Sequence, residues 1–260
     1  MEKIEINGAI LHYEIYGTGK KDLIFIHGYS ARGNLYRNLF KEISAEFRVF
    51  ALDLRGHGES ECNVASFTLN QMADDIVAFS SAMGLVDPIF AGHSLGGLLG
   101  LISELRHPTT FDTLILINPA VATGGDATPA ELAKSIVLGH RKRQVMRKNY
   151  EAMYVKPIVE EDITAFIESS CLVDPVINQR YFEIEYPKLD IADQLALVTS
   201  SVLILNGAKD EVVYSQDQHQ LALSLNNYKE VIFSDEGHLL PLENPNLAAR
   251  EMIMFAIGRS

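Results

Sequence analysis

The sequence predicts an α/β fold in which helices flank a central, mostly parallel sheet. Between residues 23 and 117, short apolar runs alternate with helical segments, which is the pattern of parallel strands joined by helical crossovers. No convincing strand pattern appears from 121 to 190, and the strand pattern resumes at residue 201. We therefore expect a core domain made of residues 1–120 and 191–260, with a helical insertion at 121–190.

The expected strands follow one another along the chain. Between Lys3 and Tyr16, two stretches with apolar residues at every second position predict an antiparallel pair at one edge of the sheet. The remaining strands are short apolar runs, bounded in part by turn residues, at 23–26, 49–52, 89–91, 114–117, 202–205 and 230–233.

Apolar residues at helical spacing predict the helices. Residues 69–83 and 95–106 lie between expected strands, and the spacing of apolar residues from Ala249 to Ile257 predicts a C-terminal helix that packs on the sheet. Inside the insertion, amphipathic stretches predict four helices, at 129–139, 141–154, 160–170 and 175–183.

A serine stands at one strand-to-helix junction, in the sequence Gly92-His93-Ser94-Leu95-Gly96. A tight turn there needs small neighbours and pushes the serine hydroxyl out above the end of the strand. The new helix also directs its N-terminal N–H groups toward any anion that forms there. The alternative is that Ser94 only caps the helix, but a cap needs no glycine on both sides. The arrangement suits nucleophilic attack on a carbonyl group.

A serine nucleophile needs a base, usually histidine, and the base needs a carboxylate that orients it. Asp210 follows the strand expected at 202–205, and His238 follows the last expected strand. Both residues therefore fall just beyond strand ends, as Ser94 does. Asp210 is also the kind of residue that turns favour. Asp235 and Glu236 remain alternatives, although they stand close to His238 along the chain.

Serine, aspartate and histidine in this order resemble the α/β-hydrolase superfamily, and the resemblance covers essentially the whole chain. Two more segments carry it. The run Ile26-His27-Gly28-Tyr29 is similar to the family's strand with its His-Gly turn, and residues 53–60 are similar to its Asp-x-Arg-Gly-x-Gly-x-Ser turn. Leu95-Gly96-Gly97 after the serine is more similar to esterases and lipases of the superfamily than to its small-molecule receptors.

The resemblance implies a catalytic triad of Ser94, Asp210 and His238, with the backbone N–H groups of Tyr29 and Leu95 as the oxyanion hole. It also implies that the insertion forms a helical cap, or lid, over the catalytic pocket. In some relatives the acid follows the strand that corresponds to 114–117. Asn118 occupies that place here and offers no carboxylate.

Other polar residues of these motifs are expected to be structural. His27 and His93 are expected to pack and to form hydrogen bonds, and His57 is expected to hold the Gly-rich turn. Asp53 and Arg55 are expected to pair, or to form hydrogen bonds, within that turn.

Side chains of the insertion are candidates to line an acyl pocket. They are Met153, Tyr154, Phe166, Tyr181 and Phe182. The alternative for each is packing between cap helices. The basic run of residues 140–143, with Arg147 and Lys148, is either an attraction for an anionic substrate group or, as we favour, a solvated helix face.

Composition narrows the possible partners and setting. A chain of 260 residues, 47% of them hydrophobic, can bury a large core, and a formal net charge of −12 argues against binding to nucleic acid or to anionic membranes. Cys62 and Cys171 are expected to be free thiols. No signal-peptide pattern and no membrane-length apolar run is present, so we expect a cytoplasmic protein that does not span a membrane. No metal-ligand motif is present, so neither a metal nor a cofactor is expected.

These expectations combine into a serine hydrolase that cleaves a small-molecule carboxylic ester, with a small or medium apolar acyl group, through an acyl-enzyme. Alternatives on the same scaffold are a lactonase, a thioesterase, an amidase, a carbon–carbon bond hydrolase, a lyase, or a small-molecule receptor with slow turnover. Dehalogenases and epoxide hydrolases of this fold are less similar, because they carry Asp where Ser94 stands. The oligomeric state is not predicted.

Overall fold

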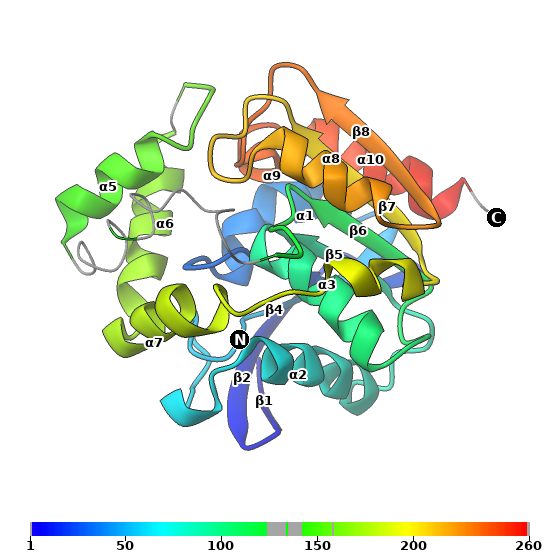
Figure 1. The fold of residues 1–260 in the computed structure, drawn as a ribbon, viewed down its shortest axis with the longest axis horizontal. Coiled ribbons are helices and arrows are strands. Elements are labelled where there is room, and N and C mark those ends of the chain that lie inside the picture. Colours follow the sequence, from blue (N-terminus) through cyan, green and yellow to red (C-terminus); the bar gives the residue numbers. More distant parts are fainter. Residues whose placement is uncertain (1, 124–133, 135–141, 158, 259–260) are drawn as a thin grey trace.

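A single eight-stranded sheet forms the centre of the computed structural model (Figure 1), which describes residues 2–123, 134, 142–157 and 159–258. The strands are β1 (Glu2–Ile6), β2 (Ala9–Tyr16), β3 (Lys21–Ile26), β4 (Phe47–Leu52), β5 (Ile89–His93), β6 (Thr113–Ile117), β7 (Ser201–Gly207) and β8 (Tyr228–Phe233). Their order is β1-β2-β4-β3-β5-β6-β7-β8. The β1–β2 and β2–β4 pairs are antiparallel, and every other neighbouring pair is parallel. The mostly parallel sheet and its antiparallel edge pair are therefore confirmed.

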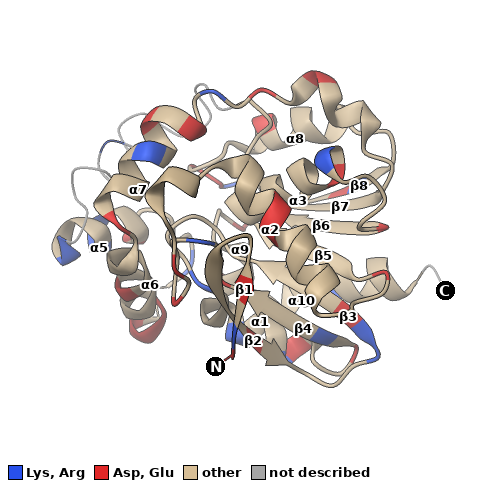
Figure 2. Cartoon of the chain, turned by 90° about the horizontal axis from the view of Figure 1, so that it is seen from below, with Lys and Arg blue, Asp and Glu red and all other residues tan. Residues whose placement is uncertain are grey.

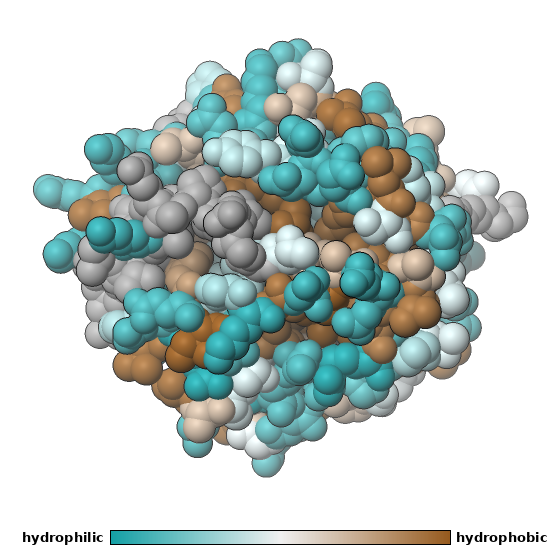
Figure 3. Space-filling view, viewed as in Figure 1, coloured by the Kyte–Doolittle hydropathy of each residue, from teal (hydrophilic) through white to brown (hydrophobic). Residues whose placement is uncertain are grey.

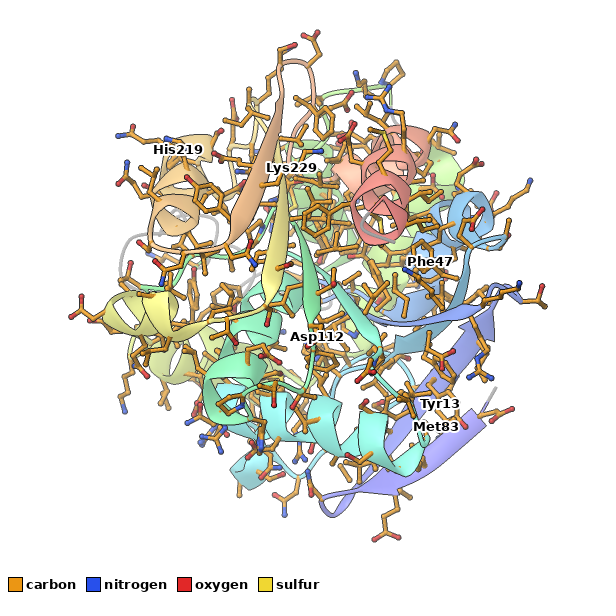
Figure 4. All side chains as sticks on the ribbon, turned by 90° about the vertical axis from the view of Figure 1, so that its right-hand side faces the viewer. Tyr13, Phe47, Met83, Asp112, His219 and Lys229 are labelled. Atoms are coloured by element: carbon orange, nitrogen blue, oxygen red, sulfur yellow. The ribbon has the colours of Figure 1, made fainter. Side chains whose placement is uncertain are left out.

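The strands of the parallel part bury side chains on both faces, which explains why the sequence shows them as continuous apolar runs. In β3, Leu23 and Phe25 belong to one core cluster, whereas Ile24 and Ile26 belong to the other. The same alternation holds in β6 and β7. In Figure 4, Tyr13 of β2 and Lys229 of β8 lie toward opposite edges of this sheet.

Helices cover both faces of the sheet. The helices α1 (Arg37–Ile43), α9 (Leu240–Glu243) and α10 (Pro245–Ile257) contribute to one core cluster, and α2 (Leu69–Ala82), α3 (Leu95–Arg106) and α8 (Ser215–Leu223) to the other. The helices expected between strands and at the C-terminus are confirmed as α2, α3 and α10. The sequence pattern does not predict α1, α8 and α9, which are short and bury few apolar side chains each.

The segment expected as an insertion leaves and rejoins the core at one place. Thr123 and Asp190 form an isolated antiparallel bridge, and the Ile191 N–H donates a hydrogen bond to the Ala122 carbonyl at 3.0 Å. Between these points lie α5 (Arg143–Glu151), α6 (Glu160–Leu172) and α7 (Pro175–Arg180), with a π-helical turn at Tyr181–Glu185. Figure 1 shows these helices together on one side of the molecule.

Three of the four helices expected in the insertion are thus present. The fourth, expected at 129–139, lies outside the described residues except for Lys134. Within 142–157 and 159–190, no strand occurs beyond the bridge at Asp190. Lys142, Arg143 and Lys148 are exposed, and Arg147 pairs with the half-buried Glu151 and the exposed Glu160. The part of the basic run that is described therefore lies on a solvated helix face.

The surface is hydrophilic over most of the face shown in Figure 3, with hydrophobic side chains visible in gaps between polar ones. Figure 2 shows acidic and basic residues spread over many elements in this view. None of the described helices is long and apolar enough to cross a membrane. Cys62 and Cys171 are free thiols, as expected.

Candidate active site

Ser94 occupies a strained turn between β5 and α3, at the carboxyl edge of the sheet. Its φ of 52° and ψ of −117° fall in a region that residues other than glycine rarely adopt. A Cβ atom on Gly92 would lie 2.4 Å from the Gly96 carbonyl carbon, and a Cβ atom on Gly96 would lie 2.2 Å from the Ile26 carbonyl oxygen. Both glycines are therefore required by the close approach of β3, the turn and α3.

The strands β7 and β8 bring two more side chains to this edge. His238 Nε2 lies 3.1 Å from Ser94 Oγ, and His238 Nδ1 lies 2.8 Å from Asp210 Oδ2. Asp210 and His238 are both buried. The three residues expected as a triad therefore form one hydrogen-bonded chain.

The alternative carboxylates near His238 point elsewhere. Asp235 is exposed and pairs with Lys209 Nζ at 2.9 Å. Glu236 is buried and pairs with Lys156 Nζ at 3.1 Å. This ion pair joins the loop that carries His238 to the segment after α5. Both carboxylates are therefore engaged with lysines.

Asp210 accepts hydrogen bonds on both carboxylate oxygens. The backbone N–H groups of residues 212–213 donate to Oδ1 at 2.9 Å each. Asn118 Nδ2 and Gln218 Nε2 donate to Oδ2, at 3.0 and 2.8 Å, beside the bond from His238. Burial by itself raises the pKa of Asp210, but His238 and the backbone donors outweigh burial and lower the pKa below its ordinary value. Asp210 is therefore ionised at neutral pH.

Asn118 and Gln218 are site residues that the sequence analysis does not assign. Asn118 carries a signal, because it directly follows β6 at the same edge as Ser94. No sequence signal points to Gln218, because it lies on α8, a helix that the sequence pattern does not predict. Only the fold brings its side chain to Asp210.

His93 connects the nucleophile turn to two neighbouring segments. Its Nε2 lies 2.8 Å from the His238 carbonyl oxygen, and its Nδ1 lies 2.8 Å from the Tyr36 hydroxyl, which accepts a hydrogen bond from the Gly28 N–H at 3.2 Å. Burial, the largest cause, lowers the pKa of His93 to about 3. The ring is therefore neutral and donates through Nε2–H to the carbonyl oxygen. These bonds agree with a structural role for His93.

The Gly-rich turn after β4 is held by two separate groups. Asp53 accepts hydrogen bonds from the Glu59 N–H at 3.1 Å and lies 2.8 Å from His12 Nδ1. Arg55 instead forms a buried bidentate pair with Asp75 of α2, at 2.6 and 2.7 Å. Hydrogen bonds of Asp53 and Arg55 within the turn are therefore confirmed. The alternative, that these two side chains pair with each other, is wrong, because α2 supplies the carboxylate for Arg55.

Tyr29 and Leu95 are the two residues expected to supply the oxyanion hole. Leu95 is the first residue of α3, and Tyr29 lies in the turn after β3. The turn after β3 lies close to Ser94, because a Cβ atom on Gly28 would be 3.3 Å from Ser94 Cβ. Within the described residues, neither N–H group donates a hydrogen bond to a protein acceptor. Both N–H groups therefore keep a free donor, and their role as an oxyanion hole stays a prediction.

A cavity opens above Ser94 and His238, and aromatic side chains form much of its wall. The Tyr29 and Tyr181 rings stack with centroids 4.1 Å apart, and the Tyr150 and Phe166 rings stack at the same distance. The volume of this cavity is about 60 Å³. One water needs about 10–15 Å³ on that measure, so the space suits a small group.

Met153, Phe166, Tyr181 and Phe182, four of the side chains expected in a pocket, line this cavity. Tyr154 does not, and the expectation for it is corrected: Tyr150 lines the cavity in its stead. The helix α5 ends at Glu151, so Tyr154 lies beyond the helical face on which Tyr150 sits, and packs against the core cluster.

Comparisons with known proteins agree with this architecture. The sequence model of a family described as serine aminopeptidase, S33, matches residues 17–243. An esterase from Exiguobacterium antarcticum superposes with a TM-score of 0.87 at 21% identity, covering 97% of this chain and 98% of that one. A meta-cleavage product hydrolase from Pseudomonas fluorescens gives 0.88 at 19% identity, covering 100% and 98%. The pimeloyl-[acyl-carrier protein] methyl ester esterase of Edwardsiella ictaluri is 24% identical, covering 97% of this chain and 99% of its own length.

Proposed function

Because this chain belongs to the serine aminopeptidase (S33) family of α/β hydrolases, we propose that it is a serine hydrolase that cleaves carboxylic esters through an acyl-enzyme. The observation that carries the proposal is the position of His238, whose two ring nitrogens lie 3.1 Å from Ser94 Oγ and 2.8 Å from Asp210 Oδ2. Such a series of hydrogen bonds converts an unreactive serine hydroxyl into a nucleophile.

In the first step, Ser94 Oγ attacks the ester carbonyl while His238 Nε2 takes its proton. The tetrahedral oxyanion then accepts hydrogen bonds from the N–H groups of Tyr29 and Leu95. Loss of one such donor in a serine hydrolase costs about 2.7–4 kcal/mol of transition-state stabilisation. His238 next gives its proton to the leaving alcohol, and Asp210 stays ionised and orients the ring.

In the second step, water attacks the acyl-enzyme. His238 takes a proton from the water, and the same two N–H groups bind the second oxyanion. Collapse of this intermediate breaks the bond to Ser94, which regains its proton from His238 as the acid leaves. Water is thus consumed, and one alcohol and one acid are formed.

The cavity favours a short, uncharged acyl group. Aromatic rings and Met153 supply much of the described lining, and no Lys or Arg belongs to it, so a carboxylate on the acyl group would find no cation. No Asp or Glu belongs to the described lining either. A free peptide N-terminus therefore finds no carboxylate for its ammonium group, and this favours ester cleavage over aminopeptidase activity. We further propose that residues 121–190 act as a cap that sets substrate choice.

The test is a panel of p-nitrophenyl esters of increasing chain length, with thioesters and lactones alongside. We expect multiple turnovers on short chains, inactivation by a serine-directed organophosphate, and a fall in kcat of about 10⁶-fold in Ser94→Ala. Unchanged thermal unfolding of that variant is the control for folding. Hydrolysis well above trace level in Ser94→Ala would exclude Ser94 as the nucleophile. Single turnover with a large thermal shift would support the receptor alternative.

A further inference from the structure

Two hydroxyl groups stand out in the largely apolar cavity above Ser94. Tyr150 and Ser30 both line the cavity, and each is only 2% exposed. Neither the Tyr150 hydroxyl nor Ser30 Oγ has a hydrogen-bond partner within the described residues. A buried hydroxyl without a partner is unfavourable, so each of these groups has unused capacity for a hydrogen bond.

Both residues have defined places at the cavity wall. The Tyr150 ring is held by its stack on Phe166, with centroids 4.1 Å apart and ring planes 17° apart. Ser30 lies in the turn after β3 with a φ of 63°, directly after Tyr29, whose N–H belongs to the proposed oxyanion hole. Ser30 is therefore the neighbour of a proposed oxyanion-hole residue, and Tyr150 lines the same cavity as Ser94.

The protein groups around Tyr150 leave its hydroxyl unsatisfied. Burial, the largest cause, raises the pKa of Tyr150 to about 12, and Ser170 and Ser30, which lie near its hydroxyl, act in the opposite direction. Ser170 Oγ donates its own hydrogen bond to Met146 Sδ at 3.3 Å. Tyr150 therefore stays protonated at neutral pH and keeps its O–H available as a donor.

We propose that Tyr150 and Ser30 form a polar subsite that binds a neutral hydrogen-bond acceptor, a keto or hydroxyl oxygen, on the acyl part of the substrate. The inference rests on the proposed ester hydrolysis and narrows its substrate class to short oxo- or hydroxy-acyl esters. A carboxylate fits less well, because no Lys or Arg belongs to the described lining. A site built to bond a polar group discriminates strongly against the analogue that lacks it.

The experiment compares matched substrates: methyl 3-hydroxybutyrate and methyl acetoacetate against methyl butyrate, by titration of released acid. In the wild type we expect a higher kcat/KM for the oxygenated esters. In Tyr150→Phe and in Ser30→Ala, the ratio of oxygenated to plain ester should fall by about tenfold. An unchanged ratio in both variants would overturn the subsite.

Tyr154→Phe is the matched control. This substitution also removes a buried tyrosine hydroxyl that has no hydrogen-bond partner within the described residues, but Tyr154 does not line the cavity. The ratio of kcat/KM for oxygenated and plain esters should therefore stay at its wild-type value. A fall in Tyr154→Phe equal to that in Tyr150→Phe would also overturn the proposal.

A binding measurement separates this inference from the proposed function. Methyl acetoacetate and methyl butyrate are titrated by calorimetry into Ser94→Ala and into Ser94→Ala/Tyr150→Phe. We expect the preference for the acetoacetate to be about tenfold weaker in the double variant. Equal preferences would overturn the subsite even if the enzyme cleaves esters. A lost preference would support it even if the wild type cleaves none of them, in which case the proposed function fails alone.

Discussion

Asp210 is the most heavily bonded carboxylate of the site, and its Oδ2 atom has two amide donors besides the histidine. Asn118 Nδ2 lies 3.0 Å and Gln218 Nε2 lies 2.8 Å from that oxygen. Such donors fix the carboxylate in place and favour its charged form. The side chain of Asn118 therefore ends close to the Asp210 oxygen to which His238 Nδ1–H donates its hydrogen bond.

This proximity predicts that the acid can be moved from one strand to the next. Asp210→Asn should lower kcat by about 10⁴-fold, because an amide at that position favours the wrong tautomer of His238. In the double variant Asn118→Asp/Asp210→Asn, the new carboxylate should recover at least about tenfold of that loss. The measurement is kcat on a short p-nitrophenyl ester. A double variant no faster than Asp210→Asn would show that position 118 cannot orient the base.

The buried pair between Arg55 and Asp75 supports a second prediction at the residue scale. Both side chains are almost fully buried and bonded at 2.6–2.7 Å. Asp75→Ala should lower the free energy of unfolding by about 3–5 kcal/mol, because it leaves the guanidinium buried without its carboxylate. The exposed pair of Arg48 with Asp22 is the control, and Asp22→Ala should cost no more than about 1 kcal/mol. Urea unfolding measures both, and equal losses would contradict the argument.

At the scale of elements, the contact between β3 and α3 sets how the nucleophile turn is built. Gly96→Ala would place a Cβ atom 2.2 Å from the Ile26 carbonyl oxygen, so the helix or the strand must move. We expect loss of most activity together with destabilisation of several kcal/mol, about the range of overpacked cores or more. Gly8→Ala is the control: its Cβ meets nothing within 4 Å, and only its φ of 72° opposes the change. That variant should cost about 1–2 kcal/mol and keep its activity.

The sequence is most informative about elements whose burial pattern is regular. The strands β3 to β7 are predicted because both of their faces are buried, and α2 and α3 because each is long enough to show an apolar stripe. The helix α8 has no such stripe: its buried side chains include Gln218, which serves Asp210 rather than the core. Local spacing therefore reveals packing, but not the polar contacts that only the fold creates.

The same limit explains the errors near the site. The pairing of Arg55 with Asp75 joins a turn to a helix that lies some way along the chain, and no local pattern announces it. Tyr150 and Tyr154 are separated by one helical turn in sequence, but the end of α5 at Glu151 decides which of the two faces the cavity. The order of Ser94, Asp210 and His238 was informative because parallel strands align their carboxyl ends at one edge.

For the whole molecule, buried neutral histidines predict how stability depends on pH. Burial, the largest cause, lowers the pKa of both His57 and His93 to about 3. Between about pH 6.5 and pH 3, the unfolded chain binds protons that the folded chain does not, so stability falls as the pH falls through this window. Each group contributes up to about 1.4 kcal/mol per pH unit. The raised pKa of His12, held up by Asp53, acts in the opposite direction.

Urea unfolding at pH 7.5, 6 and 5 tests this dependence. We expect the free energy of unfolding to decrease at each step below pH 6.5. His57→Leu should reduce the slope between pH 6 and pH 5 by up to about 1.4 kcal/mol per unit, because one fewer proton is taken up on unfolding. A slope identical to that of the wild type would show that His57 is already protonated in the folded protein.

The bridge between Thr123 and Asp190 has a consequence for how such a protein can diversify. Since the chain departs and returns through adjoining residues, the length of the intervening stretch has no bearing on the alignment of β6 with β7. That stretch can lengthen or shrink without changing how these two strands align. If the proposed cap sets substrate choice, natural variation and laboratory grafting can both alter what is recognised while this alignment is kept.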